Sequence, residues 1–137
     1  MVVKVDGQTY PDLASALRDL GGTRRHKYGA QPVELQGIHF DSTAEAQRYA
    51  ELQLLAAAGA IHALRVQPRY ELQPAFTAPT GETVRAITYK ADFEYQEDGR
   101  TIVEDVKGVA TPVFRLKAKL FRYRYPELEL RITYTKP

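Results

Sequence analysis

Cysteine is absent from the 137-residue sequence, and histidine is scarce. The three histidines, His26, His39 and His62, are spread without the spacing of metal ligands. These absences exclude a zinc–thiolate site and argue against a histidine-rich metal site, so any bound metal would need oxygen ligands. A chain of this length forms about one domain with a single core.

Long apolar runs are also missing. No stretch approaches the roughly 20 apolar residues that cross a bilayer. The first ten residues, MVVKVDGQTY, are charged early and lack the apolar core of a signal peptide. We therefore expect a soluble, cytoplasmic protein with no membrane partner.

The charge is mildly positive overall, at +2, but it is unevenly distributed. From Thr111 to the C-terminus seven basic residues stand against two acidic ones. A second cluster, Arg24, Arg25 and Lys27, lies in the segment 23–31, which has no regular period. Such clusters suit a polyanion such as DNA, although a solvated basic loop explains the second cluster equally well.

The N-terminal segment predicts a small appendage, residues 1–22, ahead of a core at 23–137. Residues 2–9 alternate around Asp6-Gly7 as in a hairpin, and a helix is expected from about 11 to 20, before Gly21-Gly22. About 20 residues cannot hold a core of their own, so the appendage must dock on the rest or order on a partner.

The remaining pattern predicts an α/β fold with a mixed central sheet flanked by two helices. The elements expected in chain order are a hairpin at 33–40, a helix at 42–58, a strand at 69–72, a long strand at 84–95, a hairpin turn at 97–100 and a strand after it, a helix at 111–125 and a strand at 127–135. For the helix at 111–125 the expected apolar side is Val113, Leu116, Leu120 and Phe121.

Charged residues on the central hairpin are the strongest functional signal. Asp105 and Lys107 are two apart on one strand and so share a face, while Asp92 lies on the neighbouring strand. Glu104 points to the opposite face. A surface salt bridge of Lys107 with either aspartate is the alternative reading of this cluster, and it would contribute about 0–1 kcal/mol.

Glu45 is a further candidate acid, with two competing explanations. Ser42-x-x-Glu45 matches a capping box, which accounts for the carboxylate structurally. The same residue heads a helical face with Tyr49 and Leu52, which is expected to face the core. A carboxylate there is costly unless it is paired or bound to metal.

Together these residues resemble the PD-(D/E)xK nuclease superfamily. More closely, the run KYGAQPVELQGIHFDSTAEAQRYAELQLL, then QPRYELQP, ITYKADFEY and VEDVKG, is similar to small phage and prophage endonuclease-like proteins, over residues 27–135. In this sequence Ala91 stands at the position of the name-giving proline, and Asp105 stands where Glu is more usual. The resemblance implies a restriction-endonuclease-like core.

The resemblance also implies a function and its residues. It makes Asp92, Asp105 and Glu45 ligands of Mg²⁺, for which Mn²⁺ would substitute, and Lys107 the catalytic lysine. The implied activity is hydrolysis of DNA phosphodiesters by a structure- or nick-directed endonuclease, resembling a junction resolvase, in a bacterial host cell if a phage encodes it. The candidate phosphate contacts are Arg85, Lys90, Arg115, Lys119 and Arg122, with Arg24, Arg25 and Lys27 in the basic segment.

Two other functions stay open at this level. One is a non-catalytic nucleic-acid-binding module on the same fold, and the other is a virion or assembly protein whose basic face is incidental. A homodimer would follow if the protein resolves junctions, because two symmetric cuts need two sites.

Overall fold

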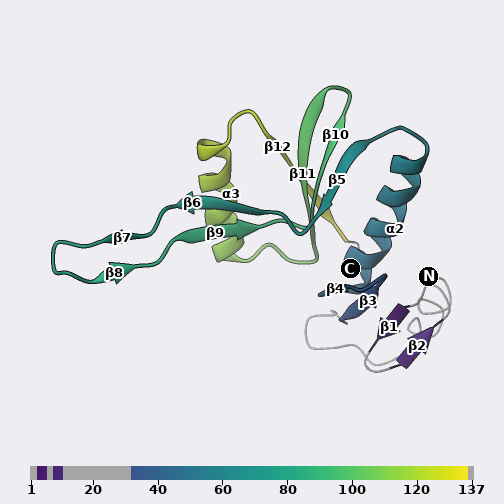
Figure 1. Ribbon diagram of the computed structural model, residues 1–137, viewed down its shortest axis with the longest axis horizontal. Coiled ribbons are helices and arrows are strands. Elements are labelled where there is room, and N and C mark those ends of the chain that lie inside the picture. Colours follow the sequence, from purple (N-terminus) through teal and green to yellow (C-terminus); the bar gives the residue numbers. More distant parts are fainter. Residues whose placement is uncertain (1–2, 6–7, 11–31, 136–137) are drawn as a thin grey trace. The chain divides into compact units, whose positions relative to one another are not determined.

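The computed structural model describes residues 3–5, 8–10 and 32–135 (Figure 1). The chain divides into two compact units, Met1–Leu54 and Leu55–Pro137. The helix predicted at 11–20 and the basic segment 23–31, with Arg24, Arg25 and Lys27, lie outside the described residues.

The first unit holds a four-stranded antiparallel sheet in the order β2-β1-β3-β4. Its strands are β1 (Val3–Val5), β2 (Gln8–Tyr10), β3 (Val33–Leu35) and β4 (Ile38–Phe40). Both predicted hairpins are therefore present, and β1 also pairs with β3. The N-terminal hairpin thus extends the same sheet as the second hairpin, and both lie in the unit that ends at Leu54.

Local turn chemistry explains the hairpin between β3 and β4. Gln36 and Gly37 have φ values of 54° and 79°, the pair of positive angles that a type I′ turn requires. The turn places Val33, Leu35 and Phe40 on the buried side of the sheet.

Helix α2 (Thr43–Ala57) follows directly and confirms the helix predicted at 42–58. The ring of Tyr49, on this helix, contacts the ring of Phe40 on β4, with 5.3 Å between the ring centroids. Gly59 follows the helix end with φ of 79°, the left-handed conformation that glycine adopts without strain.

The second unit is built on a mixed sheet in the order β12-β11-β10-β5. Its strands are β5 (His62–Val66), β10 (Phe93–Glu97), β11 (Arg100–Lys107) and β12 (Glu129–Tyr134). The strands β5, β10 and β11 are antiparallel, whereas β12 runs parallel to β11 after the crossover through helix α3 (Pro112–Arg124). The described residues therefore form an α/β protein with a mixed sheet and two helices, as predicted.

The strand prediction fails in two places. The segment 63–74 was expected to hold one strand but contributes β5 as well as β6 (Arg69–Gln73), separated by Gln67 at positive φ. The long strand expected at 84–95 is divided among β8 (Thr83–Val84), β9 (Ile87–Lys90) and β10. Alternating residues continue across the bend at Ala91 and Asp92, so periodicity alone does not reveal the break.

Residues 69–90 form a two-stranded ribbon. Here β6 pairs with β9, and farther out β7 (Phe76–Thr77) pairs with β8. Figure 1 shows this ribbon projecting from the second unit, with β7 and β8 at its far end.

Helix α3 lies within the predicted range of 111–125 but buries a different face. Of the four apolar residues predicted to pack, only Phe121 is buried, while Val113 and Leu116 are 63% and 59% exposed and Leu120 is 36% exposed. Phe114 and Ala118 join Phe121 in the core instead. The core of this unit comprises Tyr70, Leu72, Tyr89, Ala91, Val103, Phe114, Ala118 and Phe121. No helix among the described residues has the length and apolar character needed to cross a membrane.

Candidate functional site

Asp105 is the centre of the candidate site. It lies on β11, and only 1% of it is exposed. The Lys107 Nζ atom lies 3.2 Å from its Oδ1, and the Tyr89 hydroxyl donates a hydrogen bond to its Oδ2. Both oxygens of the buried carboxylate therefore have a partner, one from its own strand and one from β9.

Asp92 lies opposite Asp105. It was predicted to be part of a strand, but it is not. It occupies the bend between β9 and β10, where its N–H still donates to the Glu104 carbonyl at 3.1 Å. The β10–β11 register pairs Phe93 with Glu104, so one further step brings Asp92 opposite Asp105, and residues directly opposite share a face. The Asp92 Oδ2 accepts a hydrogen bond from the Val106 N–H at 2.7 Å.

Lys107 is held from two sides. Besides its contact with Asp105, its Nζ lies 4.4 Å from the centre of the Phe114 ring, a cation–π arrangement. Phe114 is in the first turn of α3, where its N–H donates to the Thr111 side chain at 3.2 Å and so caps the helix. The lysine side chain is 29% exposed, which leaves its ammonium group within reach of solvent.

Electrostatics links the two aspartates to Tyr89. Burial raises the pKa of the Tyr89 hydroxyl, and the negative charge and hydrogen bond of Asp105, followed by the charge of Asp92, raise it further. The hydroxyl therefore keeps its proton at neutral pH and acts as a donor. Tyr89 was missed as a site residue because an aromatic on the apolar face of a strand is typical of a core position.

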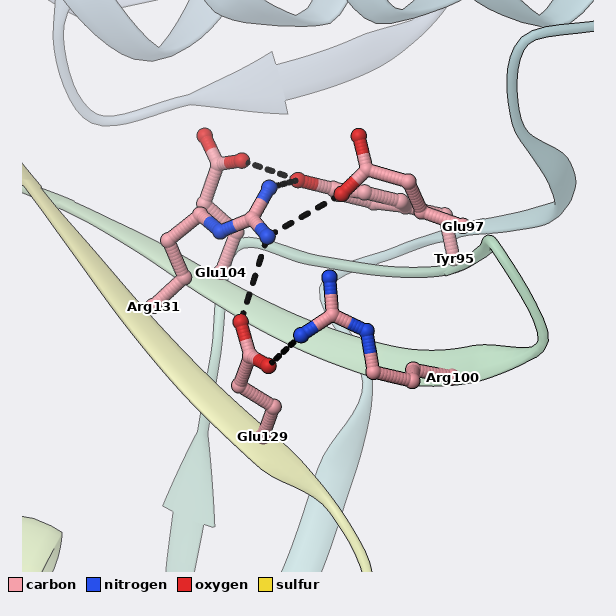
Figure 2. A network of polar contacts seen from close by, with 6 residues as sticks. All are labelled: Tyr95, Glu97, Arg100, Glu104, Glu129 and Arg131. Atoms are coloured by element: carbon pink, nitrogen blue, oxygen red, sulfur yellow. Dashed lines mark hydrogen bonds and ion pairs between the residues drawn. The ribbon is translucent and has the colours of Figure 1, made fainter.

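Glu104 points away from this cluster, as predicted. Its buried carboxylate accepts a hydrogen bond from the Tyr95 hydroxyl at 2.6 Å, and Arg131 donates to the same hydroxyl at 3.2 Å. Figure 2 shows the network that continues from Arg131, which contains Tyr95, Glu97, Arg100, Glu104, Glu129 and Arg131. Neighbouring residues of β11 thus send their carboxylates to opposite sides of the sheet.

Glu45 lies in the first unit, near the start of α2. Its N–H donates to the Ser42 Oγ at 3.2 Å, and its Oε2 accepts from the Asp41 N–H at 3.3 Å. This confirms the helix-capping part of the prediction, with the carboxylate returning to residue 41 rather than to residue 42. Its role as a metal ligand stays a prediction.

Comparison with known families gives one result. A family model described as "Protein of unknown function (DUF1064)" matches residues 25–136. The chain belongs to the DUF1064 family. No curated protein and no solved structure matches it. The matched segment includes every element of the second unit and therefore the whole aspartate–lysine cluster.

Among the described residues of the DUF1064 chain, the basic ones predicted to contact phosphate lie on two surfaces. Arg85 and Lys90 are exposed on the ribbon, the first between β8 and β9 and the second on β9. Arg115, Lys119 and Arg122 are exposed along α3. Arg69, which pairs with Lys90 across the ribbon, is a basic residue that no sequence pattern singled out.

Asp92 and Asp105 are the two carboxylates that would supply oxygen ligands to a metal ion in the predicted site. The described part of the DUF1064 chain contains no group of three or more His, Cys, Asp or Glu side chains placed to hold a metal. Mg²⁺ binds through one or two carboxylates and completes its shell with water and substrate phosphate oxygens. Each carboxylate has about four lone-pair sites, so the hydrogen bonds described above leave acceptor capacity. An aspartate pair therefore fits Mg²⁺ or Mn²⁺.

Proposed function

We propose that the protein is a Mg²⁺-dependent DNA endonuclease with a restriction-endonuclease-like core in its second unit. The observation that supports this most strongly is the buried Asp105 carboxylate beside Lys107, with Asp92 opposite on the adjoining segment. The order of these residues along the chain matches the nuclease superfamily pattern. Mn²⁺ would replace Mg²⁺.

Burial argues against a merely structural ion pair. Asp105 is almost fully enclosed, whereas a surface salt bridge would leave both groups in water. Removing a carboxylate from water costs several kcal/mol, and an apolar residue of similar volume would often stabilise the fold equally well or better. Glu104 is buried as well, so chemistry at Asp105 is favoured by its place beside Lys107 and opposite Asp92 rather than by burial alone.

Each group has a distinct task in this proposal. Asp92 and Asp105 would hold the cation, which activates water and stabilises the negative charge of the reacting phosphate. Lys107, partly exposed and next to Asp105, orients the attacking water and offsets charge that develops on the phosphorus oxygens. Tyr89 fixes the orientation of the Asp105 carboxylate by donating to its Oδ2.

The substrate is proposed to be DNA with a structural feature, such as a nick or a junction, rather than a long sequence. The ribbon and α3 of the second unit carry exposed cations, which suit contacts with backbone phosphates. Shape and deformability supply specificity when few base contacts are available. Resolution of junctions would require two copies, so a homodimer is proposed for that activity.

The experiment incubates the protein with plasmid and with four-way-junction DNA in Mg²⁺, Mn²⁺ or EDTA. We expect metal-dependent cleavage by the wild type and its loss in Asp105→Asn and Lys107→Ala. Glu104→Gln is the matched control, because it alters the adjacent buried acid on the opposite face of β11 and should retain cleavage.

Two results would reject the catalytic assignment. One is cleavage in EDTA, and the other is equal activity of Asp105→Asn and wild type. Tight DNA binding without cleavage in either metal would instead favour a non-catalytic nucleic-acid-binding module.

A further inference from the structure

Two cations face each other across the base of the ribbon. Arg69 of β6 and Lys90 of β9 are directly paired in the register, and both side chains are exposed. Like charges directly opposite in an antiparallel pair destabilise the sheet. Within the part of the chain that the structure describes, neither residue forms an ion pair with a carboxylate.

The nearby acids are directed elsewhere. Glu71, two residues beyond Arg69 on the same face of β6, has its Oε1 3.7 Å from Arg124 of α3. Glu94, two residues beyond Asp92, accepts from the Tyr70 hydroxyl at 2.6 Å and from Arg65 at 3.0 Å. The Arg69–Lys90 pair is therefore left with uncompensated positive charge.

Backbone pairing connects this charge to the candidate site. Beyond the pair, the Ala91 N–H donates to the Pro68 carbonyl at 3.1 Å, and the Gln67 N–H donates to the Asp92 carbonyl at 2.8 Å. Backbone hydrogen bonds thus extend from the Arg69–Lys90 pair to Asp92. Lys90 precedes Asp92 by two residues, with the bend at Ala91 and Asp92 following directly after it.

We propose that Arg69 and Lys90 form a binding site for a backbone phosphate of the nucleic acid, next to the phosphate that reacts at Asp92 and Asp105. The inference rests on the proposed nuclease function and extends it by naming the contact that positions the substrate strand. An anion between the two side chains relieves their repulsion, and the planar guanidinium of Arg69 offers two donors to one phosphate.

The first test measures DNA binding without cleavage. Fluorescence anisotropy of a labelled duplex in EDTA, over a range of salt concentrations, compares wild type with Arg69→Gln, Lys90→Gln and the double variant. Each lost phosphate contact should reduce the slope of log K against log salt by about 0.9, and the double variant by about 1.8. Arg100→Gln is the matched control, because it removes the same charge from a residue that is paired with Glu129. Its slope should stay at the wild-type value.

The second test uses inorganic phosphate and needs no DNA. Thermal unfolding is compared in phosphate and in chloride at equal ionic strength, and the extra stabilisation of wild type by phosphate should disappear in the double variant. Unchanged salt slopes in the double variant, together with an unchanged response to phosphate, would overturn the proposed phosphate site even if wild type cleaves DNA. A phosphate response that needs both cations, in a protein that neither binds nor cleaves DNA, would support the phosphate site and reject the proposed nuclease function.

Discussion

The Tyr89 hydroxyl donates a hydrogen bond to Oδ2 of Asp105, on the same carboxylate whose Oδ1 lies 3.2 Å from the Lys107 Nζ. Tyr89 is on β9 and Asp105 is on β11, so this hydrogen bond joins two strands. Asp92, in the bend before β10, also contacts β11 by accepting from the Val106 N–H. The tyrosine ring itself is fixed by the core, with 5.4 Å between its centroid and that of Phe121. The orientation of Asp105 is thus determined by residues of the core.

Replacing Tyr89 with Phe tests this relationship. The ring contacts remain, but Asp105 loses a donor while staying buried, so we expect a destabilisation of about 1–3 kcal/mol and reduced cleavage. Urea denaturation and the plasmid assay measure the two effects. Tyr95→Phe is the matched control, since it removes the equivalent donor from Glu104 on the other face and should preserve cleavage. Full cleavage by Tyr89→Phe would show that the hydroxyl does not position the acid.

The loss of stability at alkaline pH should also distinguish Tyr89→Phe from the wild type. Burial, then Asp105, raises the pKa of Tyr89 above its ordinary value near 10, so the folded state holds the proton more tightly than the unfolded state. The resulting stability is complete below about pH 10 and is lost as the pH rises above it. Burial and Glu94 act similarly on Tyr70, so Tyr89→Phe should lose stability less steeply, not become insensitive. Urea midpoints from pH 8 to 11 measure this, and parallel curves would contradict it.

Local chemistry explains which elements could be predicted from the sequence. The hairpin turns at Gln36-Gly37 and Asp98-Gly99 both have positive φ angles, which their glycines adopt without strain, and α2 has a capping serine. The face of α3 could not be predicted in the same way. Its apolar residues form two stripes, and the buried stripe is the one whose rings at Phe114 and Phe121 meet the aromatic residues of the ribbon. That choice depends on a tertiary partner, which periodicity does not contain.

Two alanine substitutions on α3 test this assignment. Phe114→Ala should cost about 3–5 kcal/mol, because it opens a cavity in the core and removes the ring beneath Lys107. Leu116→Ala, two residues away on the exposed side, should change stability by less than about 0.5 kcal/mol. Chemical denaturation of both variants measures the difference. A larger loss for Leu116→Ala would restore the face predicted from the sequence.

Site residues could be predicted where strand periodicity determines which face of the sheet a side chain takes. Other features of the site could not be predicted in this way. Asp105 and Lys107 share a face because they are two residues apart, and Glu104 takes the other face for the same reason. The bend at Asp92 was not predictable, because alternation continues through it. Arg69 was hidden because its partner Lys90 is 21 positions away along the sequence and only the ribbon register brings them together.

Metal binding should stabilise the wild type. Two carboxylates that face one patch repel each other until a cation is bound, so Mg²⁺ should raise the melting temperature, with about 2.7 kcal/mol expected at 100 times the dissociation constant. Asp92→Asn should lose this response, while its amide oxygen can still accept from the Val106 N–H. Glu104→Gln is the control that should keep it. Equal Mg²⁺ shifts in wild type and Asp92→Asn would place the ion elsewhere.

Glu45 requires a substitution that separates capping from chemistry. In Glu45→Gln the side chain keeps an oxygen that can accept from the Asp41 N–H, and the backbone N–H of residue 45 still donates to Ser42, so stability should change by less than about 0.5 kcal/mol. If the reaction needs the carboxylate, cleavage is lost nonetheless. Ser42→Ala is the complementary control, because it removes the cap at a cost of about 1 kcal/mol but leaves the acid. Cleavage by Glu45→Gln at the wild-type rate would leave Glu45 with its capping role alone.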